Sequence, residues 1–147
     1  MAPRNYARRD TWAVKLRFEG NMIDGFWDTR TGGEIDTDTT TYSPGGMLDP
    51  LALGSTPKPQ NLVLGRIFTE TDMAILDDLL RGAGSGACIV YQHPLDFNKK
   101  KWGKSIVWHG ILKRVNMVEV DSNSTDAGIY EIEITPAGTP QVGTSTA

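Results

Sequence analysis

The chain has 147 residues, which is enough for one domain with a substantial core. It carries 15 basic and 18 acidic residues, and the resulting net charge of −3 excludes the basic composition of a dedicated nucleic-acid-binding protein. No apolar run approaches the about 20 residues of a membrane span, and residues 1–10 lack the apolar segment of a secretory signal, so we expect no membrane association. The single cysteine, Cys88, excludes an internal disulfide and indicates synthesis in a reducing cytoplasm.

The N-terminal part of the chain predicts an arm followed by strands. Residues 1–10 have no apolar pattern, and we expect them to form a flexible arm. Residues 11–18 alternate between apolar and polar side chains, which predicts a half-buried strand. Its apolar face consists of Trp12, Val14, Leu16 and Phe18. A short strand is expected at 25–30, before the turn Thr31-Gly32-Gly33.

Residues 34–42 predict a strand with almost no apolar face. Alternation along a strand places Asp36, Asp38 and Thr40 on one side, together with Glu34. Threonines favour a strand, but such a strand buries little in a monomer, and a long polar edge invites pairing with another chain. The pattern therefore indicates an assembly protein, with one face of this strand toward water and the other toward a neighbouring subunit.

The next segment, residues 43–60, contains four prolines and three glycines. This composition predicts a long loop between strands, without regular structure. The segment also carries four large apolar side chains, at Met47, Leu48, Leu51 and Leu53. We therefore expect this loop to pack against another surface.

The rest of the chain predicts one helix among further strands. Thr69 is a good N-cap for a helix over 69–82, which Gly82 ends. The expected strands are 61–68, 87–93, 105–120 with a bulge or bend at Gly110, and 128–135. A lysine-rich hairpin tip connects the strands on either side of residues 94–103, and residues 137–147 predict a flexible tail. The sum is one mainly β domain over 11–136, a β-sandwich or partly open barrel with one flanking α-helix.

No motif indicates catalysis, a metal or a cofactor. The glycine-rich stretch 82–86 runs from helix to strand, which is the reverse of the order that a phosphate-binding loop needs. His93 and His109 are far apart in sequence, so a zinc site is not indicated. Residues 121–126 lack the glycine and the glutamate of a calcium loop, and no GxSxG motif is present. We expect no enzyme activity.

Charge is distributed unevenly along the chain. Residues 1–17 carry five basic side chains, whereas residues 19–49 carry seven acids and a single arginine. Such segregation is typical of solvated surfaces, and it also suits complementary contacts between copies of one subunit. The arginines expected to make such contacts are Arg4, Arg8 and Arg9.

A series of motifs follows one another along the chain: DTRTGGEID at 28–36, YSPGGM at 42–47, NLVLGR at 61–66, the short helix, QHPLD at 92–96, GILKRV at 110–115 and EIEIT at 131–135. In the order of these motifs the chain resembles the major tail tube proteins of tailed bacteriophages, of the siphophage-like kind. The resemblance covers roughly residues 10–138.

This resemblance implies homohexameric rings that stack into a hollow tube for DNA ejection from the virion. It implies a channel lined by the sheets of all subunits, for which we expect Asp36, Asp38 and Thr40 to face the lumen. It also implies a long loop that reaches the next ring, here through Met47, Leu48, Leu51 and Leu53. Partners implied are further copies of the chain and the tail terminator, tape measure and distal tail proteins, while DNA passes without specific binding.

Three alternatives remain open at this point. The first is another ring-forming tail component, such as a tail terminator, or the tube subunit of a contractile injection or secretion system. The second is a monomeric carbohydrate-binding β-sandwich, although the four tryptophans are scattered along the chain. The third is an enzyme.

Overall fold

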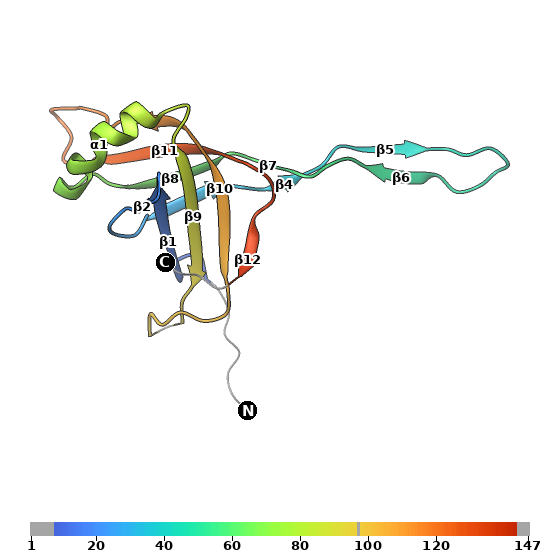
Figure 1. Cartoon of the computed structure of the whole chain (residues 1–147), viewed down its shortest axis with the longest axis horizontal. Coiled ribbons are helices and arrows are strands. Elements are labelled where there is room, and N and C mark those ends of the chain that lie inside the picture. The colour runs from blue at the N-terminus through green and yellow to red at the C-terminus, as the bar shows by residue number, and fades with distance from the viewer. Residues whose placement is uncertain (1–7, 97, 144–147) are drawn as a thin grey trace.

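The computed structural model describes residues 8–96 and 98–143 and shows a mainly β fold with one helix and a long projecting hairpin (Figure 1). The elements, in chain order, are β1 (Trp12–Phe18), β2 (Asn21–Met22), β3 (Thr29–Gly32), β4 (Ile35–Asp36), β5 (Thr39–Tyr42), β6 (Leu51–Gly54), β7 (Lys58–Pro59), β8 (Leu62–Ile67), α1 (Glu70–Gly82), β9 (Ala87–Pro94), β10 (Ser105–Asn116), β11 (Ile129–Pro136) and β12 (Gln141–Gly143). The predicted fold class is confirmed.

The main sheet is antiparallel and curls until it is nearly closed. Its strand order is β2-β1-β9-β10-β11-β8-β3, and β12 pairs with the beginning of β10. The segment between β2 and β3 crosses the open side: the amide of Trp27 donates to the carbonyl of Val14 on β1 at 2.8 Å. The next amide, of Asp28, donates to Gly65 on β8 at 3.0 Å. One short segment thus bridges both edges of a partly open barrel.

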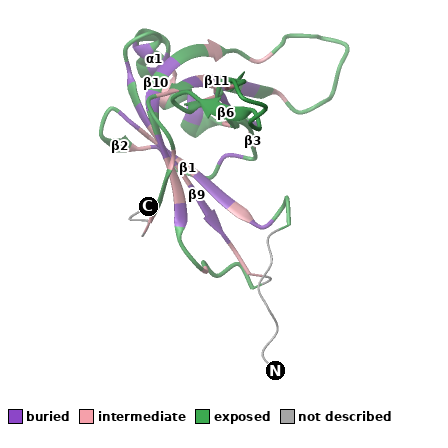
Figure 2. Ribbon diagram, turned by 90° about the vertical axis from the view of Figure 1, so that its right-hand side faces the viewer, coloured by how far each residue is buried: buried purple, intermediate pink, exposed green. Residues whose placement is uncertain are grey.

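The core lies inside this curled sheet and beneath the helix (Figure 2). Alternating residues of β1 point inward, with Leu16 completely buried, as their spacing predicts. Trp27 and Phe68 pack against the buried ring of Tyr130, with centroids 5.5 and 5.4 Å away. Leu79 is the most deeply buried apolar side chain of α1 and joins the helix to this core.

The helix begins where the sequence predicts. Thr69 is extended and forms a capping box with Asp72, which lies at the third helical position. At the other end, Gly82 and Gly86 approach the ring of Phe18 so closely that a Cβ on either glycine would lie 2.3 or 2.4 Å from a ring carbon. Glycine is therefore required at both positions to let the helix end against β1.

Two expectations for the second half of the chain need correction. The tail expected over 137–147 is a strand at Gln141–Gly143, and residues 144–147 lie outside the described residues. The irregularity expected at Gly110 is a bulge between Leu112 and Arg114. Gly110 has a different role, because a Cβ there would lie 2.4 Å from the Thr135 carbonyl oxygen of the neighbouring strand.

The largest correction concerns residues 43–60. They contain two strands, β6 and β7, which pair with β5 and β4 to form a hairpin rather than a structureless loop. Each strand of a two-stranded hairpin has one unpaired edge, and a proline is tolerated where its nitrogen faces that edge. Pro59 lies at such a position, so its missing N–H costs no hydrogen bond of the ladder. The expected strand over 25–30 begins only at Thr29, because the residues before it cross between sheet edges.

Candidate assembly site

Residues 33–60 form a two-stranded hairpin, here called the arm, that projects from the body beyond β3 and β8 (Figure 1). Its base is fixed by the hydrogen bonds from Gly33 to the Asn61 carbonyl, at 3.3 Å, and from Gln60 to the Glu34 carbonyl, at 2.7 Å. Every residue of β5 and β6 is exposed. An isolated two-stranded hairpin is marginally stable in water, so the arm is suited to being covered by another surface.

The two faces of the β5–β6 ladder differ in character. Directly opposite residues share a face, and the register pairs Thr40 with Leu53 and Tyr42 with Leu51. This apolar face exposes about half of each large side chain: 58% of Tyr42, 54% of Leu51 and 50% of Leu53. The opposite face carries only small side chains, Thr39, Thr41, Ala52 and Gly54.

The tip of the arm adds two more apolar side chains. Met47 is fully exposed and Leu48 is 66% exposed. Met47 has a positive φ of 61°, next to Gly46 at 76°, so the turn holds the methionine in the left-handed region. The four residues predicted to contact another ring, Met47, Leu48, Leu51 and Leu53, therefore all lie on the arm and are exposed.

The acidic residues predicted to face a channel lie where the arm leaves the body. Asp36 pairs with Lys58 in the β4–β7 ladder, and its carboxylate accepts from the Thr37 amide at 2.8 Å. Ser55 donates its amide to the Asp38 carbonyl at 2.9 Å, while the Thr37 hydroxyl donates to the Ser55 carbonyl at 2.6 Å. Asp36 and Asp38 are both exposed and line a shallow pocket of about 120 Å³.

Thr40 has different neighbours from these two aspartates. It belongs to the arm proper and shares the apolar face with Leu53. The ladder also changes register between Asp36–Lys58 and Thr39–Gly54, so the simple alternation assumed from the sequence does not run unbroken from Asp36 to Thr40.

The N-terminal arginines lie at the end of the body where β1 begins. Arg4 lies outside the described residues. Arg8 forms a salt bridge with Asp10 of the same chain at 2.9 Å, and both are solvent-exposed. Arg9 is exposed and lines a pocket of about 190 Å³ with Trp12, Trp27 and Arg30. Their contacts with other copies stay a prediction.

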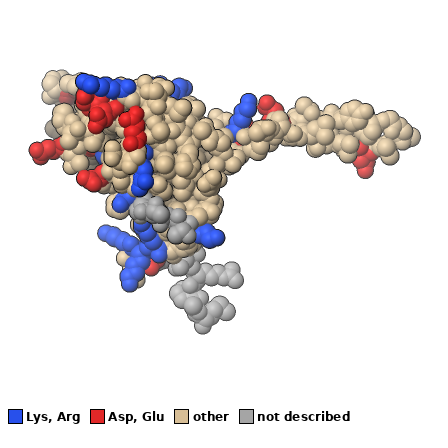
Figure 3. Space-filling view, in the orientation of Figure 1, with Lys and Arg blue, Asp and Glu red and all other residues tan. Residues whose placement is uncertain are grey.

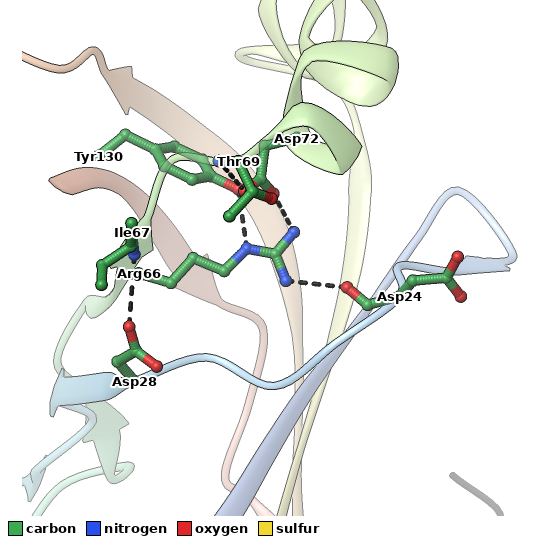
Figure 4. A network of polar contacts seen from close by, with 7 residues as sticks. All are labelled: Asp24, Asp28, Arg66, Ile67, Thr69, Asp72 and Tyr130. Carbon is green, nitrogen blue, oxygen red and sulfur yellow. Dashed lines mark hydrogen bonds and ion pairs between the residues drawn. The ribbon is translucent and has the colours of Figure 1, made fainter. Parts of the chain in front are cut away.

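A buried polar network, which the sequence analysis missed, fastens the helix to the sheet (Figure 4). Arg66 of β8 forms an ion pair with Asp72 of α1 and donates to the Tyr130 hydroxyl at 3.0 Å. Tyr130 in turn donates to Asp72 at 2.6 Å. Arg66 also donates to the Asp24 carbonyl at 2.9 Å and stacks on Trp27, 4.4 Å from its ring centroid.

The network favours the charged form of its carboxylate. Burial by itself acts to raise the pKa of Asp72, but hydrogen bonds from Tyr130, from the Thr69 backbone and hydroxyl, and from Arg66 lower this pKa below its usual value. Burial raises the pKa of Tyr130, and the hydrogen bond to Asp72 raises it further. The network therefore joins the helix to the sheet with a charged carboxylate and a neutral phenol.

The described residues offer little reactive chemistry. Burial raises the pKa of Cys88 to about 12, with a contribution from Glu19, so its thiol is protonated at neutral pH. No three His, Cys, Asp or Glu side chains within 8–96 and 98–143 could hold a metal ion together. The 13-residue helix α1 is too short and too polar to cross a membrane.

Comparison with known proteins supports the fold. No family model matches the chain, and no curated protein matches it in sequence. The fold matches a chain in the cryo-EM structure of the anti-feeding prophage (AFP) baseplate with a TM-score of 0.73, 17% identity and complete coverage of both chains. A chain in the AFP tube-terminating cap matches with a TM-score of 0.73 and 10% identity, over 99% of this chain and 95% of that one.

A third similar structure belongs to the PVC particle. A chain of the sheath–tube complex of the PVC extracellular contractile injection system matches with a TM-score of 0.65 and 12% identity, over 90% of this chain and 89% of that one. The TM-scores show that these chains share one fold, and the identities of 10–17% are too low to show more than the fold. The chain shares its fold with chains of the AFP baseplate, the AFP tube-terminating cap and the PVC sheath–tube complex.

Proposed function

We propose that this chain is the structural tube subunit of a phage-tail-like particle, whose copies form hexameric rings that stack into a hollow tube. The observation that carries the proposal is the arm, which exposes Tyr42, Leu51 and Leu53 on one face. The β5–β6 part of the arm projects away from the rest of the chain, so the chain itself does not cover this face. Moving a large apolar side chain from full exposure to full burial contributes about 1.5–3 kcal/mol. Roughly half of this gain remains for each of these half-exposed side chains, so a second copy that covers this face gains stability. The role is structural and needs no catalytic residue.

The shared fold supports the same proposal. The match to the AFP baseplate chain extends over the full length of both chains, and that structure is six-fold symmetrised. We propose that the arm of one copy reaches the next ring and contacts it through Met47, Leu48, Leu51 and Leu53. A contact of this kind repeats from ring to ring and leads to a polymer rather than a closed dimer.

The channel of the tube would be lined near the base of the arm. We propose that Asp36 and Asp38 face the lumen, where a ring of carboxylates repels phosphate and lets DNA slide. A basic lining would instead bind DNA through counterion release and hold it in place. DNA passes without specific binding in this proposal.

The N-terminal arginines would contribute a contact that depends on charge. We propose that Arg4, Arg8 and Arg9 of one subunit lie near acidic side chains of an adjacent copy. The Arg8–Asp10 salt bridge is solvent-exposed, so exchanging it for a contact between subunits loses little energy.

The type of particle is a finer part of the proposal. The sequence motifs resemble siphophage-like tail tubes, whereas the structures compared belong to contractile or prophage-derived systems. We propose a place in the tail of such a particle, with tail terminator, tape measure and distal tail proteins as partners. Sequence motifs and the shared fold both support the proposal of a tube-type subunit, and they point to different kinds of tail.

A second candidate function is a terminating ring at the tube end. Two observations favour it: chains in the AFP tube-terminating cap and in the PVC sheath/tube terminator have this fold, the latter with a TM-score of 0.64. A terminator forms one ring and stops polymerisation, whereas a tube subunit continues it.

Negative-stain electron microscopy of the purified chain separates these functions. Long tubes of constant diameter are expected for a tube subunit, and single rings for a terminator. A chain that stays monomeric at high concentration would overturn both. Replacing residues 38–55 by an Asn-Gly turn should abolish tubes while the body stays folded; normal tubes from this variant would contradict the role of the arm.

A further inference from the structure

The two ends of the β1–β9 pair carry opposite charge. At one end, residues 8–12 and 94–105 contain six basic and two acidic residues. At the other end, residues 19–24 and 70–82 contain six acidic residues and one basic residue. Five of these acids are exposed, and the sixth, Asp72, is buried and paired with Arg66. The register places these ends apart, because Trp12 pairs with Pro94 and Phe18 pairs with Cys88, six residues or roughly 20 Å along the strand.

Figure 3 shows this separation on the molecular surface. Blue side chains gather at the lower end of the body, and red side chains gather around the helix at the upper left. Other charges near the helix are paired within the chain: Arg81 with Asp77, and Lys113 and Arg114 with Glu133. The body therefore has a basic end and an acidic end, and the line that joins them runs in a different direction from the arm.

At the basic end, hydrogen bonds fix the backbone of a lysine-rich hairpin. The lysine hairpin, residues 98–104, carries the exposed side chains of Lys99, Lys100, Lys101 and Lys104. The carboxylate of Asp96 accepts from the amides of Asn98 and Lys100, at 2.8 and 2.9 Å. Trp102 donates its amide to the Pro94 carbonyl at 3.1 Å, which ties the hairpin to the end of β9. These bonds hold the backbone of the hairpin, from which the exposed lysine side chains project.

The acidic end has a groove between the helix and the turn after β1. Its cavity measures about 380 Å³, with Phe18, Ile75 and Leu79 among its apolar lining residues. Glu19, Asp24 and Asp78 line the same groove and are exposed to solvent. An apolar floor with acidic side chains at its rim suits the aliphatic stems and ammonium groups of lysines.

We propose that the lysine hairpin of one copy docks in this acidic groove of a second copy. The inference rests on the proposed function, since it requires that copies assemble. Hairpin and groove lie at opposite ends of the same strands, so the contact is head-to-tail and can repeat from copy to copy. It is a second interface, distinct from the apolar contact of the arm, and it selects the orientation of neighbouring subunits through charge.

Charge exchange between two variants tests the contact. One variant carries Lys99→Glu and Lys100→Glu, and the other carries Glu19→Lys and Asp78→Lys. Each alone should raise the concentration needed for assembly by about tenfold or more, because like charges then face each other. An equimolar mixture should restore assembly, since each hairpin then finds an oppositely charged groove on the other variant. Sedimentation and electron microscopy measure both effects.

Controls keep the outcomes distinguishable. Glu119→Lys with Asp126→Lys changes the net charge equally but lies outside the groove, and it should assemble like the original chain. If Glu19→Lys with Asp78→Lys does not fold, Glu19→Gln with Asp78→Asn should weaken assembly in the same direction.

The result that overturns this contact is separate from failure of the proposed function. Normal tubes from both charge-reversed variants, or a mixture as defective as its components, would overturn the contact and leave the tube intact. If the original chain forms no tubes, the proposed function fails. The contact is then tested by sedimentation equilibrium of the two variants, where a mixture that associates no more than either variant alone overturns it.

Discussion

Thr40 lies directly opposite Leu53 in the β5–β6 ladder, so their side chains share one face of the arm. The sequence interpretation gave these residues different surroundings, the lumen for Thr40 and a neighbouring ring for Leu53. If this face is buried against another copy, Thr40 is buried together with Leu53. We therefore propose that Thr40 belongs to the same contact as Leu53, and we keep the lumen prediction for Asp36 and Asp38.

The two faces of the arm should differ in their effect on assembly. Leu51→Ser with Leu53→Ser removes two large side chains from the apolar face. The variant should raise the concentration needed for assembly about tenfold or more, because burying the exposed half of each leucine contributes roughly half of the about 1.5–3 kcal/mol for complete burial. Thr39→Ser with Thr41→Ser changes the opposite face and serves as the matched control. Light scattering against concentration measures both, and equal behaviour of the two variants would contradict the face assignment.

The charge of the lumen can be tested without disturbing the contact face. Asp36→Lys with Asp38→Lys should leave tubes intact and slow DNA ejection, because the new lysines bind passing phosphates. Raising the salt concentration should recover part of the rate. Glu119→Lys with Asp126→Lys, two exposed positions outside the arm, is the control for a charge change of the same size. Ejection kinetics unchanged by the double substitution would count strongly against a lumen position.

Much of the fold could be predicted from the sequence because its signals are local. The alternation in β1 and the N-cap at Thr69 depend on neighbouring residues only, and the structure confirms both. The strands of the arm were partly missed, because prolines and glycines around Leu51–Gly54 outweigh its strand preference when pairing is not visible. Pairing with Thr39–Tyr42 is what makes this segment a strand.

The buried network shows what local patterns cannot reveal. Arg66 and Tyr130 are 64 residues apart, and only the pairing of β8 with β11 brings them together. Asp72 gave a partial signal, since an acid three residues after Thr69 is typical of a capping box. Nothing in that motif indicates that the carboxylate also binds a buried arginine and a buried tyrosine.

Removing the carboxylate of this network should destabilise the fold. Asp72→Asn leaves the charge of Arg66 buried without its ion-pair partner, and we expect a loss of about 3–5 kcal/mol in the free energy of unfolding. Asp77→Asn breaks the exposed pair with Arg81 and should change stability by less than about 1 kcal/mol. Urea denaturation measures both. Similar midpoints for the two variants would contradict the stabilising role of the network.

The same network should shape the dependence of stability on pH. Because the pKa of Asp72 is lower in the folded chain, its contribution is complete above the unfolded value of about 3.9 and is lost as the pH falls through the folded value. Because the pKa of Tyr130 is higher in the folded chain, stability falls as the pH rises above the unfolded value of about 10. In Asp72→Asn, the free energy of unfolding should fall less steeply as the pH is lowered below about 4. An unchanged dependence on pH in this range would contradict this assignment.

The buried thiol of Cys88 gives an independent measure of how often the body opens. Burial raises its pKa to about 12, so at pH 8 the folded chain presents almost no thiolate, and the side chain is 1% exposed. We expect a disulfide reagent to label Cys88 only through unfolding, at a rate that rises steeply when urea or Asp72→Asn lowers stability. Cys88→Ser controls for reaction elsewhere. Rapid labelling of the native chain, at the rate of a free thiol, would show that β9 and the helix end do not enclose this residue.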